Sequence, residues 1–285
     1  MSWRGNAIWI TGASSGIGAA LAEAFAAGGA ALILSGRRRD ALDALAARLD
    51  ADSLVLPFEV TDRDSLPAAA ATAWNWRGAI DMLVNNAGIS QRSLAIDTAP
   101  EVFDRLIDID LHAPIRLTQL LLPRMAERRS GTIVMISSVA GRLGPVLRTG
   151  YAAAKHGLIG YADALRAEVE QAYGLRVVNV LPGSVRTGVA KNALQGDGSA
   201  RGESDANIEA GMDPAECARR ILAGLAQGQR EILVAEGAEA FAAGLRWQDP
   251  ERLFDMLSVE GKRLADARAE GAGPEPALVN RSRSE

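Results

Sequence analysis

The sequence predicts a single α/β domain with a doubly wound parallel sheet. Short apolar runs typical of buried strands alternate with longer stretches rich in Ala and Leu along most of the chain. A glycine-rich turn, Gly12-Ala-Ser-Ser-Gly16-Ile-Gly18, follows the first apolar run. The chain has 285 residues, of which 48% are hydrophobic, so it can bury one large core. These observations favour one domain over repeats or two small domains.

The composition argues against several classes of protein. The formal net charge of −4 argues against a nucleic-acid-binding surface. Cys217 is the only cysteine, and His112 and His156 are the only histidines, so we expect neither an internal disulfide nor a metal site. No apolar run approaches the ~20 residues that span a bilayer, and the first residues lack a signal-peptide pattern. We therefore expect a cytoplasmic protein without a transmembrane segment.

The first strand and its turn have the composition of a phosphate-binding site. Residues 7–11 are mostly apolar, and a helical run to about residue 27 follows the glycine turn. Glycines allow backbone amides to approach a pyrophosphate, and a helix N-terminus favours negative charge. A purely structural turn is the alternative, but the position at a strand–helix junction favours the phosphate site.

The second strand, residues 31–35, indicates which cofactor binds. In dinucleotide-binding folds an acidic residue at this strand end binds the ribose 2′-hydroxyl, whereas an arginine accommodates a 2′-phosphate. Here the acidic residue is absent, and Arg37, Arg38 and Arg39 follow Gly36. The sequence therefore favours NADP(H), with NAD(H) as the other possibility. Alternatively, the arginines could begin the solvated helix expected over residues 40–49.

Two more strands are expected at residues 54–58 and 81–85. Thr61 or Asp62 is expected to cap the helix between them, which should extend to about residue 76. The later strand ends in a polar turn, Asn85-Asn86-Ala87-Gly88, at the position where open α/β sheets bind ligands. Residues 100–129 predict a long helical region that bends around Pro114.

The rest of the chain continues the alternation of strands and helices. A strand over residues 132–138 and a helix capped by Thr149 are expected first, then a strand at 175–181. A loop rich in Gly, Ser and Asp follows at 184–211, then a helix starting at Pro214 and a last strand at 231–234. Residues 236–270 predict amphipathic helices that fold back on the domain or, in decreasing preference, contact another subunit or a membrane surface. Residues 271–285 are expected to be disordered.

Tyr151 and Lys155 lie four residues apart in an Ala-rich run, so on a helix they share one face. An ammonium group beside a phenol is expected to lower the tyrosine pKa from its usual value of about 10. Tyr151 would then donate or accept a proton near neutral pH. The hydroxyl of Ser138 could hydrogen-bond the same substrate oxygen. Such a pair also occurs by chance in many helices, so the glycine turn is needed as a second, independent signal.

Taken in order, the glycine turn, Asn86-Ala87-Gly88, Ser138 and Tyr151-x-x-x-Lys155 resemble the short-chain dehydrogenase/reductase family. The resemblance covers roughly residues 6–235. It implies a seven-stranded Rossmann-like sheet within a catalytic domain of residues 1–235, with no separate substrate domain, and a homo-oligomer. It also implies an NADP(H)-dependent oxidoreductase that interconverts a carbonyl compound and an alcohol.

The resemblance gives each motif a role. Tyr151 would exchange a proton with the substrate oxygen, Lys155 would hold the nicotinamide ribose, and Ser138 would orient the carbonyl. Asp110 stands where the family usually has Asn, a residue thought to hold a water in a proton relay behind the lysine. Asp110 could still accept hydrogen bonds from water or Lys155, and its charge could change the pH dependence of the relay. The implied cofactor contacts are Gly12, Ser14, Ser15, Gly16, Ile17, Gly18, Arg37, Arg38, Glu59 (where Asp or Asn is commoner), Val60, Asn86, Ala87, Gly88, Tyr151, Lys155, Pro182, Gly183, Val185 and Thr187.

The substrate is expected to be an apolar carbonyl compound or secondary alcohol, because the positions expected to line its site are mostly apolar. Arg142 and Arg148 could attract an anion, although exposed loop arginines are more often simply solvated. Two other functions stay open: a nucleotide-binding sensor or scaffold without turnover, and an epimerase or dehydratase that uses the same cofactor. The expected lining positions are Ile89, Ser90, Gln91, Leu143, Val146, Leu147 and residues 189–194.

Overall fold

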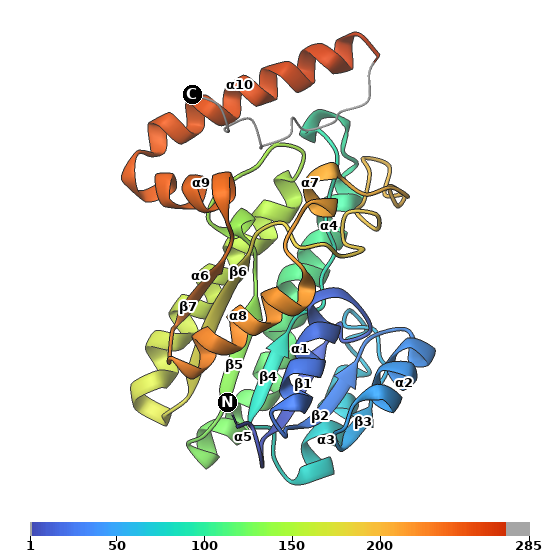
Figure 1. The fold of residues 1–285 in the computed structure, drawn as a ribbon, viewed down its shortest axis with the longest axis vertical. Coiled ribbons are helices and arrows are strands. Elements are labelled where there is room, and N and C mark those ends of the chain that lie inside the picture. The colour runs from blue at the N-terminus through green and yellow to red at the C-terminus, as the bar shows by residue number, and fades with distance from the viewer. Residues whose placement is uncertain (1, 272–285) are drawn as a thin grey trace.

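The computed structural model describes residues 2–271 and contains one seven-stranded parallel sheet (Figure 1). The strand order is β3-β2-β1-β4-β5-β6-β7, so the chain moves outward from β1 in one direction and then in the other. This arrangement confirms the predicted doubly wound sheet. The strands are β1 (Ala7–Thr11), β2 (Ala31–Ser35), β3 (Ser53–Val55), β4 (Met82–Asn85), β5 (Thr132–Ile136), β6 (Arg176–Pro182) and β7 (Glu231–Val234).

Helices cover both faces of the sheet, which is why the central strands are apolar on both sides. Ile8 and Ile10 of β1 point to one face, where Phe25 and Leu42 pack. Trp9 points to the other face. The first face carries α1 (Gly16–Ala27), α2 (Arg39–Arg48) and α8 (Pro214–Ala226), and the second carries α3 (Leu66–Arg77), α5 (Ala113–Arg128) and α6 (Thr149–Tyr173).

The strand register brings the sequence motifs to one edge of the sheet. Thr11 of β1 pairs with Ser35 of β2, and Asn85 of β4 pairs with Met135 of β5. The residues that follow these four strand ends therefore meet at the carboxyl edge. The glycine turn, the arginines and the Asn86–Gly88 turn are all among them.

The structure corrects the sequence prediction at the starts or ends of three elements. β3 ends at Val55 rather than at residue 58, where Pro57 lacks a backbone donor. The next helix begins at Leu66, because Asp62 instead accepts hydrogen bonds from the backbone N–H groups of Asp64 and Ser65. Thr149 is the first residue of α6 and not its cap.

The predicted helical region from residue 100 to 129 is interrupted just before Pro114. It consists of α4 (Pro100–Ile107), one turn of π-helix (Asp108–His112) and α5. Pro114 has no backbone N–H to donate to the carbonyl of Asp110, four residues earlier, so the regular helical pattern fails there. The widened turn carries Asp110 into the protein interior.

The C-terminal extension forms α9 (Gly237–Gln248) and α10 (Pro250–Ala269). Figure 1 shows both helices at the end of the molecule opposite the N-terminus. Ala243, Leu245 and Leu253 form a small buried cluster with Leu143. Arg268 of α10 pairs with Asp97 of the short helix η1 (Ala95–Asp97).

The two helices of the extension also carry exposed apolar side chains, of which Trp247 and Val259 are the most exposed, each at 71%. Between residues 2 and 271, no helix combines the length and apolar character needed to cross a membrane. The predicted disorder of the tail concerns residues that lie, apart from Gly271, outside the described part of the chain.

Candidate active site

A cleft with a volume of about 590 Å³ opens at the carboxyl edge of the sheet. It is lined by nearly every residue that the sequence predicts for catalysis or for cofactor binding; the two exceptions are Gly18, which packs against Gly12, and Asp110, which packs against Gly88. The predicted residues that line it are Gly12, Ser14, Ser15, Gly16, Ile17, Arg37, Arg38, Glu59, Val60, Asn86, Ala87, Gly88, Ser138, Tyr151, Lys155, Pro182, Gly183, Val185 and Thr187.

The glycine turn is packed so tightly that side chains would not fit. Gly12 has a φ of +65°, and a Cβ atom there would lie 2.8 Å from the Cα of Ala87. A Cβ atom on Gly18 would collide with the carbonyl oxygen of Gly12. The turn and the start of α1 therefore approach each other closely and leave backbone amides facing the cleft, a shape suited to a pyrophosphate.

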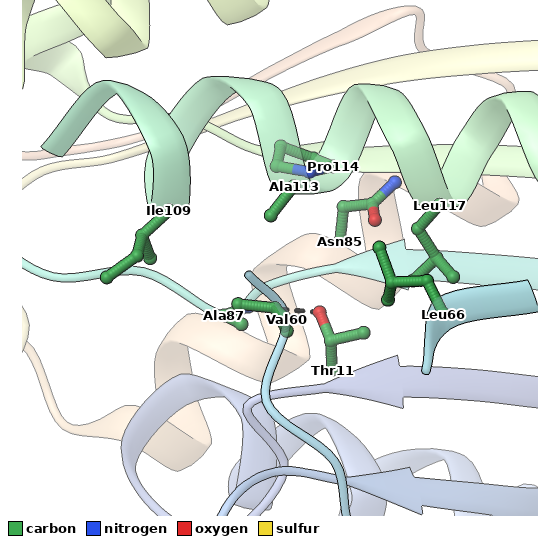
Figure 2. A pocket seen from close by; sticks show the side chains of 9 residues that line it. All are labelled: Thr11, Val60, Leu66, Asn85, Ala87, Ile109, Ala113, Pro114 and Leu117. Atoms are coloured by element: carbon green, nitrogen blue, oxygen red, sulfur yellow. Dashed lines mark hydrogen bonds between the residues drawn. The ribbon is translucent and has the colours of Figure 1, made fainter. Parts of the chain in front are cut away.

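Thr11 ties the glycine turn to the Asn86–Gly88 turn. Its Oγ1 accepts hydrogen bonds from the backbone N–H of Asn86 (3.0 Å) and of Ala87 (3.1 Å). The Asn86 amide donates in return to the carbonyls of Thr11 (2.9 Å) and Gly12 (3.2 Å). Figure 2 shows Thr11 reaching towards Ala87 beside a small cavity, which Ile109 lines from the opposite side.

We expect Thr11→Val to lower the free energy of unfolding by about 1–3 kcal/mol, the cost of leaving buried donors without a partner. Valine keeps the volume of Thr11 but cannot accept from the two backbone N–H groups. Urea denaturation of both proteins measures the difference. Thr72→Val is the matched control, because the Thr72 hydroxyl lies on an exposed helix face. Equal losses in the two variants would contradict the role given to Thr11.

Tyr151, Lys155 and Ser138 converge on the cleft from α6 and from the end of β5. The Lys155 ammonium lies over the Tyr151 ring, 5.6 Å from its centroid, and donates a hydrogen bond to the carbonyl of Ile136 (3.2 Å). The Ser138 hydroxyl donates to the carbonyl of Pro182 (3.3 Å) and accepts from the N–H of Ala140 (3.1 Å). The backbone thus fixes both polar groups beside the phenol.

Asp110 lies beside Lys155 and is fully buried. Its Oδ1 accepts a hydrogen bond from the N–H of Ile89 (3.0 Å) and lies 3.7 Å from the Lys155 ammonium. Its Oδ2 has no hydrogen-bond partner within residues 2–271. Burial raises the pKa of Asp110 to about 6, against the opposing effect of the Lys155 charge. A Cβ atom on Gly88 would lie 2.6 Å from Asp110 Oδ1, so this carboxylate packs against the cleft wall.

Gln91 positions Tyr151, a role that the sequence pattern does not reveal. Its side-chain carbonyl accepts hydrogen bonds from the backbone N–H groups of Gly150 (2.8 Å) and Tyr151 (3.3 Å) at the start of α6. Gln91 is fully buried and was expected to line the substrate site instead. No local pattern could have paired it with a helix 59 residues further along the chain.

The predicted substrate positions are only partly correct. Leu143 packs with α9 and α10, and Leu147 is buried, so neither lines the cleft. Val146 does not line the cleft either. The predicted positions that do line it are Ile89, Ser90, Val189, Asn192 and Leu194.

The two loop arginines are not simply solvated, in contrast to the expectation. Arg142 pairs with Glu231 and lies over the Trp247 ring, 5.5 Å from its centroid. Arg148 lines the cleft beside Tyr151. Within the described residues, no group of three or more His, Cys, Asp or Glu side chains could hold a metal ion.

Comparison with known proteins agrees with this geometry. A family model described as short chain dehydrogenase matches residues 6–198. Dehydrogenase/reductase SDR family member 7B of Bos taurus is 35% identical over 269 residues, which cover 91% of this chain and 82% of that protein. Dehydrogenase/reductase SDR family member 7 of Homo sapiens is 36% identical over 236 residues, which cover 80% of this chain and 70% of that protein.

Two solved structures extend the likeness to the fold. A short-chain dehydrogenase from Streptomyces avermitilis shares 30% identity and a TM-score of 0.75, covering 95% of this chain and 98% of that one. A short-chain dehydrogenase from Sphingobium yanoikuyae in complex with NADPH shares 27% identity and a TM-score of 0.73, covering 98% of each chain. With the cleft, its glycine turn and the Tyr151–Lys155 pair in place, the chain belongs to the short-chain dehydrogenase/reductase family of oxidoreductase enzymes.

Proposed function

We propose that this enzyme interconverts a carbonyl compound and an alcohol with NADP(H), and that Tyr151 exchanges the proton with the substrate oxygen. The observation that carries the proposal is the convergence of Ser138, Tyr151 and Lys155 on the same cleft as the glycine turn. The NADPH complex of the Sphingobium yanoikuyae relative supports the type of cofactor.

The shape of the cleft fits a dinucleotide. Backbone atoms occupy the space that a Cβ atom on Gly12 or Gly18 would need. Because these residues have no side chains, a pyrophosphate could approach the backbone N–H groups of the turn. Asn86, Ala87 and Gly88 would lie along the ribose, and Pro182, Gly183, Val185 and Thr187 would hold the nicotinamide end. When bound, the nicotinamide supplies or accepts the hydride, and the protein supplies orientation and charge.

The protein's own groups would handle the proton. The Tyr151 hydroxyl gives its proton to the carbonyl oxygen during reduction and takes one from the alcohol during oxidation. The Lys155 ammonium, held by the Ile136 carbonyl, stabilises the negative charge that Tyr151 carries after giving up its proton. The Ser138 hydroxyl would turn from the Pro182 carbonyl to the substrate oxygen and fix its position.

Arg37 and Arg38 provide the preference for NADP(H) in this proposal. The Arg38 guanidinium donates to the Ser14 hydroxyl (3.1 Å), and Arg37 lies 3.7 Å from a carboxylate oxygen of Glu59. Both line the cleft beside the end of β2, whereas Arg39 begins α2 and does not line it. A 2′-phosphate at this strand end would meet two cations and no carboxylate from β2.

We expect Arg38→Ala to raise the KM for NADPH roughly tenfold and to change the KM for NADH less than about twofold, because only NADPH carries the phosphate that the arginine would bind. Steady-state kinetics with each cofactor measures the two values. Arg39→Ala is the control and should alter neither constant. An equal rise in the KM for NADPH and the KM for NADH would show that Arg38 does not bind the 2′-phosphate.

A panel of ketones, aldehydes and secondary alcohols, assayed with NADPH and NADP⁺, tests the proposed reaction. Steady consumption of NADPH with at least one carbonyl compound is the expected result. Binding of NADPH with no turnover across the panel would favour a sensor or scaffold. Conversion of substrate without net change in NADPH would favour an epimerase or dehydratase.

A further inference from the structure

Three arginines surround a single carboxylate at one side of the cleft. Asp205 lies in the long segment after β6 and is buried. Its Oδ2 accepts hydrogen bonds from Nε (2.6 Å) and a terminal nitrogen of Arg92, and its Oδ1 accepts from Arg201. Both carboxylate oxygens are therefore occupied before the third arginine, Arg148, is counted.

Arg148 is left with an incompletely neutralised charge. Its guanidinium comes no closer than 3.9 Å to Asp205, and it donates no side-chain hydrogen bond to any residue between 2 and 271. Glu239 is the other carboxylate near it, and both Glu239 oxygens accept from the N–H and hydroxyl of Ser184. Burial and the charge of Arg92 lower the pKa of Arg148 to about 10. The Arg148 side chain is partly buried, at 22% exposed, and lines the cleft, so its largely desolvated charge gains from pairing with an anion that enters the cleft.

The backbone before Arg148 is held in a rarely used conformation. Leu147 has a φ of +66°, in the left-handed region that a branched apolar residue seldom adopts. Burial of its side chain and a hydrogen bond from the Ser93 N–H to its carbonyl (3.1 Å) maintain this turn. Such conformations persist where surrounding structure fixes them, commonly at functional sites. Here the turn places Arg148 at the N-cap position of α6.

Arg148 and Lys155 lie on opposite sides of Tyr151 along α6. Arg148 comes three residues before Tyr151 and Lys155 four residues after it. With a rise of about 1.5 Å per residue, the Cα atoms of the two residues are offset from the Cα of Tyr151 by ~4.5 Å and ~6 Å, in opposite directions along the helix axis. Since the proposed function assigns Lys155 to the cofactor ribose, we assign Arg148, on the other side of the phenol, to the substrate.

We propose that the substrate carries a negatively charged oxyanion, a carboxylate or a phosphate-type group, within a few bonds of its carbonyl, and that Arg148 binds that group. The inference rests on the proposed function, since it names the substrate class of the same cleft. The fork of donors on a guanidinium matches two oxygens of such a group. Apolar side chains line the neighbouring wall, at Ile89, Val189, Leu194 and Ile208, and would contact the rest of the substrate.

Matched pairs of acid and neutral ester test the inference with NADPH. The pairs are acetoacetate with its methyl ester, and acetonylphosphonate with its dimethyl ester. We expect kcat/KM for at least one acid to exceed that of its ester about tenfold or more. Arg148→Met should lower this acid-to-ester ratio by roughly 10–100-fold, the usual effect of losing a hydrogen bond to a charged group, and Arg148→Lys should restore part of it. The pair that responds identifies the oxyanion.

Arg142→Met is the matched control, because this arginine lies in the same loop, has a similar exposed fraction and contacts Glu231 instead of the cleft. It should leave the acid-to-ester ratio unchanged. An acid no better than its ester in the unchanged enzyme, for both pairs, would overturn the inference. An equal loss of kcat/KM for acid and ester in Arg148→Met would do so as well.

Calorimetric titration of acetoacetate and acetonylphosphonate into the NADPH complex of Tyr151→Phe separates this inference from the proposed function. We expect one acid to bind, and to bind at least tenfold more weakly when Arg148→Met is added. Absence of binding by either acid would overturn the inference even if neutral ketones are reduced. Binding without any turnover by the unchanged enzyme would support the anion site and contradict the proposed reaction instead.

Discussion

Tyr151→Phe is expected to lower kcat for carbonyl reduction by at least ~10²-fold while leaving the Kd for NADPH within about twofold of its original value. The substitution removes only the hydroxyl that would protonate the substrate oxygen. The substitution keeps the ring, which lies beneath the Lys155 ammonium and packs against the buried cluster of Val102, Leu106 and Leu194. Steady-state kinetics gives the change in kcat, and fluorescence titration of NADPH gives the Kd.

Tyr161→Phe provides the control on the same helix. The Tyr161 hydroxyl accepts a hydrogen bond from Gln119 (2.9 Å) and does not line the cleft. Its loss should leave kcat nearly unchanged. Undiminished turnover in Tyr151→Phe would falsify the assignment of Tyr151 as the proton donor, and loss of NADPH binding would show that the substitution disturbs the site as a whole.

Asp110→Asn is expected to stabilise the protein at pH 8 by an amount on the order of 2–3 kcal/mol, which follows from a shift of about two pKa units. The Asp110 pKa is raised to about 6 in the folded protein because the carboxylate is buried. The folded state therefore holds this proton more tightly than the unfolded chain does. As a result, stability from this group falls as the pH rises from about 4 to about 6 and stays low above that range. Asparagine removes the buried charge and keeps an acceptor for the Ile89 N–H.

Urea denaturation of both proteins at several pH values between 4 and 8 measures this effect. The difference in unfolding free energy between the variant and the original protein isolates Asp110 from the other titrating groups. It should be small near pH 4 and reach its full size above about pH 6. A variant that is less stable at pH 8 would show that the attraction between Asp110 and Lys155, 3.7 Å away, outweighs the cost of burial.

The family pattern alone does not predict the burial or the pKa of Asp110. The family pattern marks Asp110 as a departure, and only the structure shows that one of its oxygens is buried without a partner among the described residues. The pKa of the group depends on the depth of the π-turn and on the distance to Lys155, neither of which a motif contains.

The sequence by itself determined the sheet, its parallel strands and the residues that line the end of the cleft proposed for the cofactor. These features depend on signals a few residues long: the apolar run of β1, the spacing of Gly12, Gly16 and Gly18, and the four-residue spacing of Tyr151 and Lys155. The residues that follow parallel strands lie at the same edge of the sheet, because the carboxyl ends of the strands meet there. Local patterns are therefore enough to predict which residues lie together at this edge.

Only the tertiary structure decided how the substrate side is built. Gln91 caps a helix that begins far along the chain, and Arg92 pairs with Asp205, 113 residues away. Arg148 was expected to be a solvated loop residue, and the structure places it, partly buried, in the wall of the cleft beside Arg92 and Asp205. The physical reason is that a charge's surroundings are set by whichever segments fold against it, whereas strand and helix patterns are set by near neighbours in the chain.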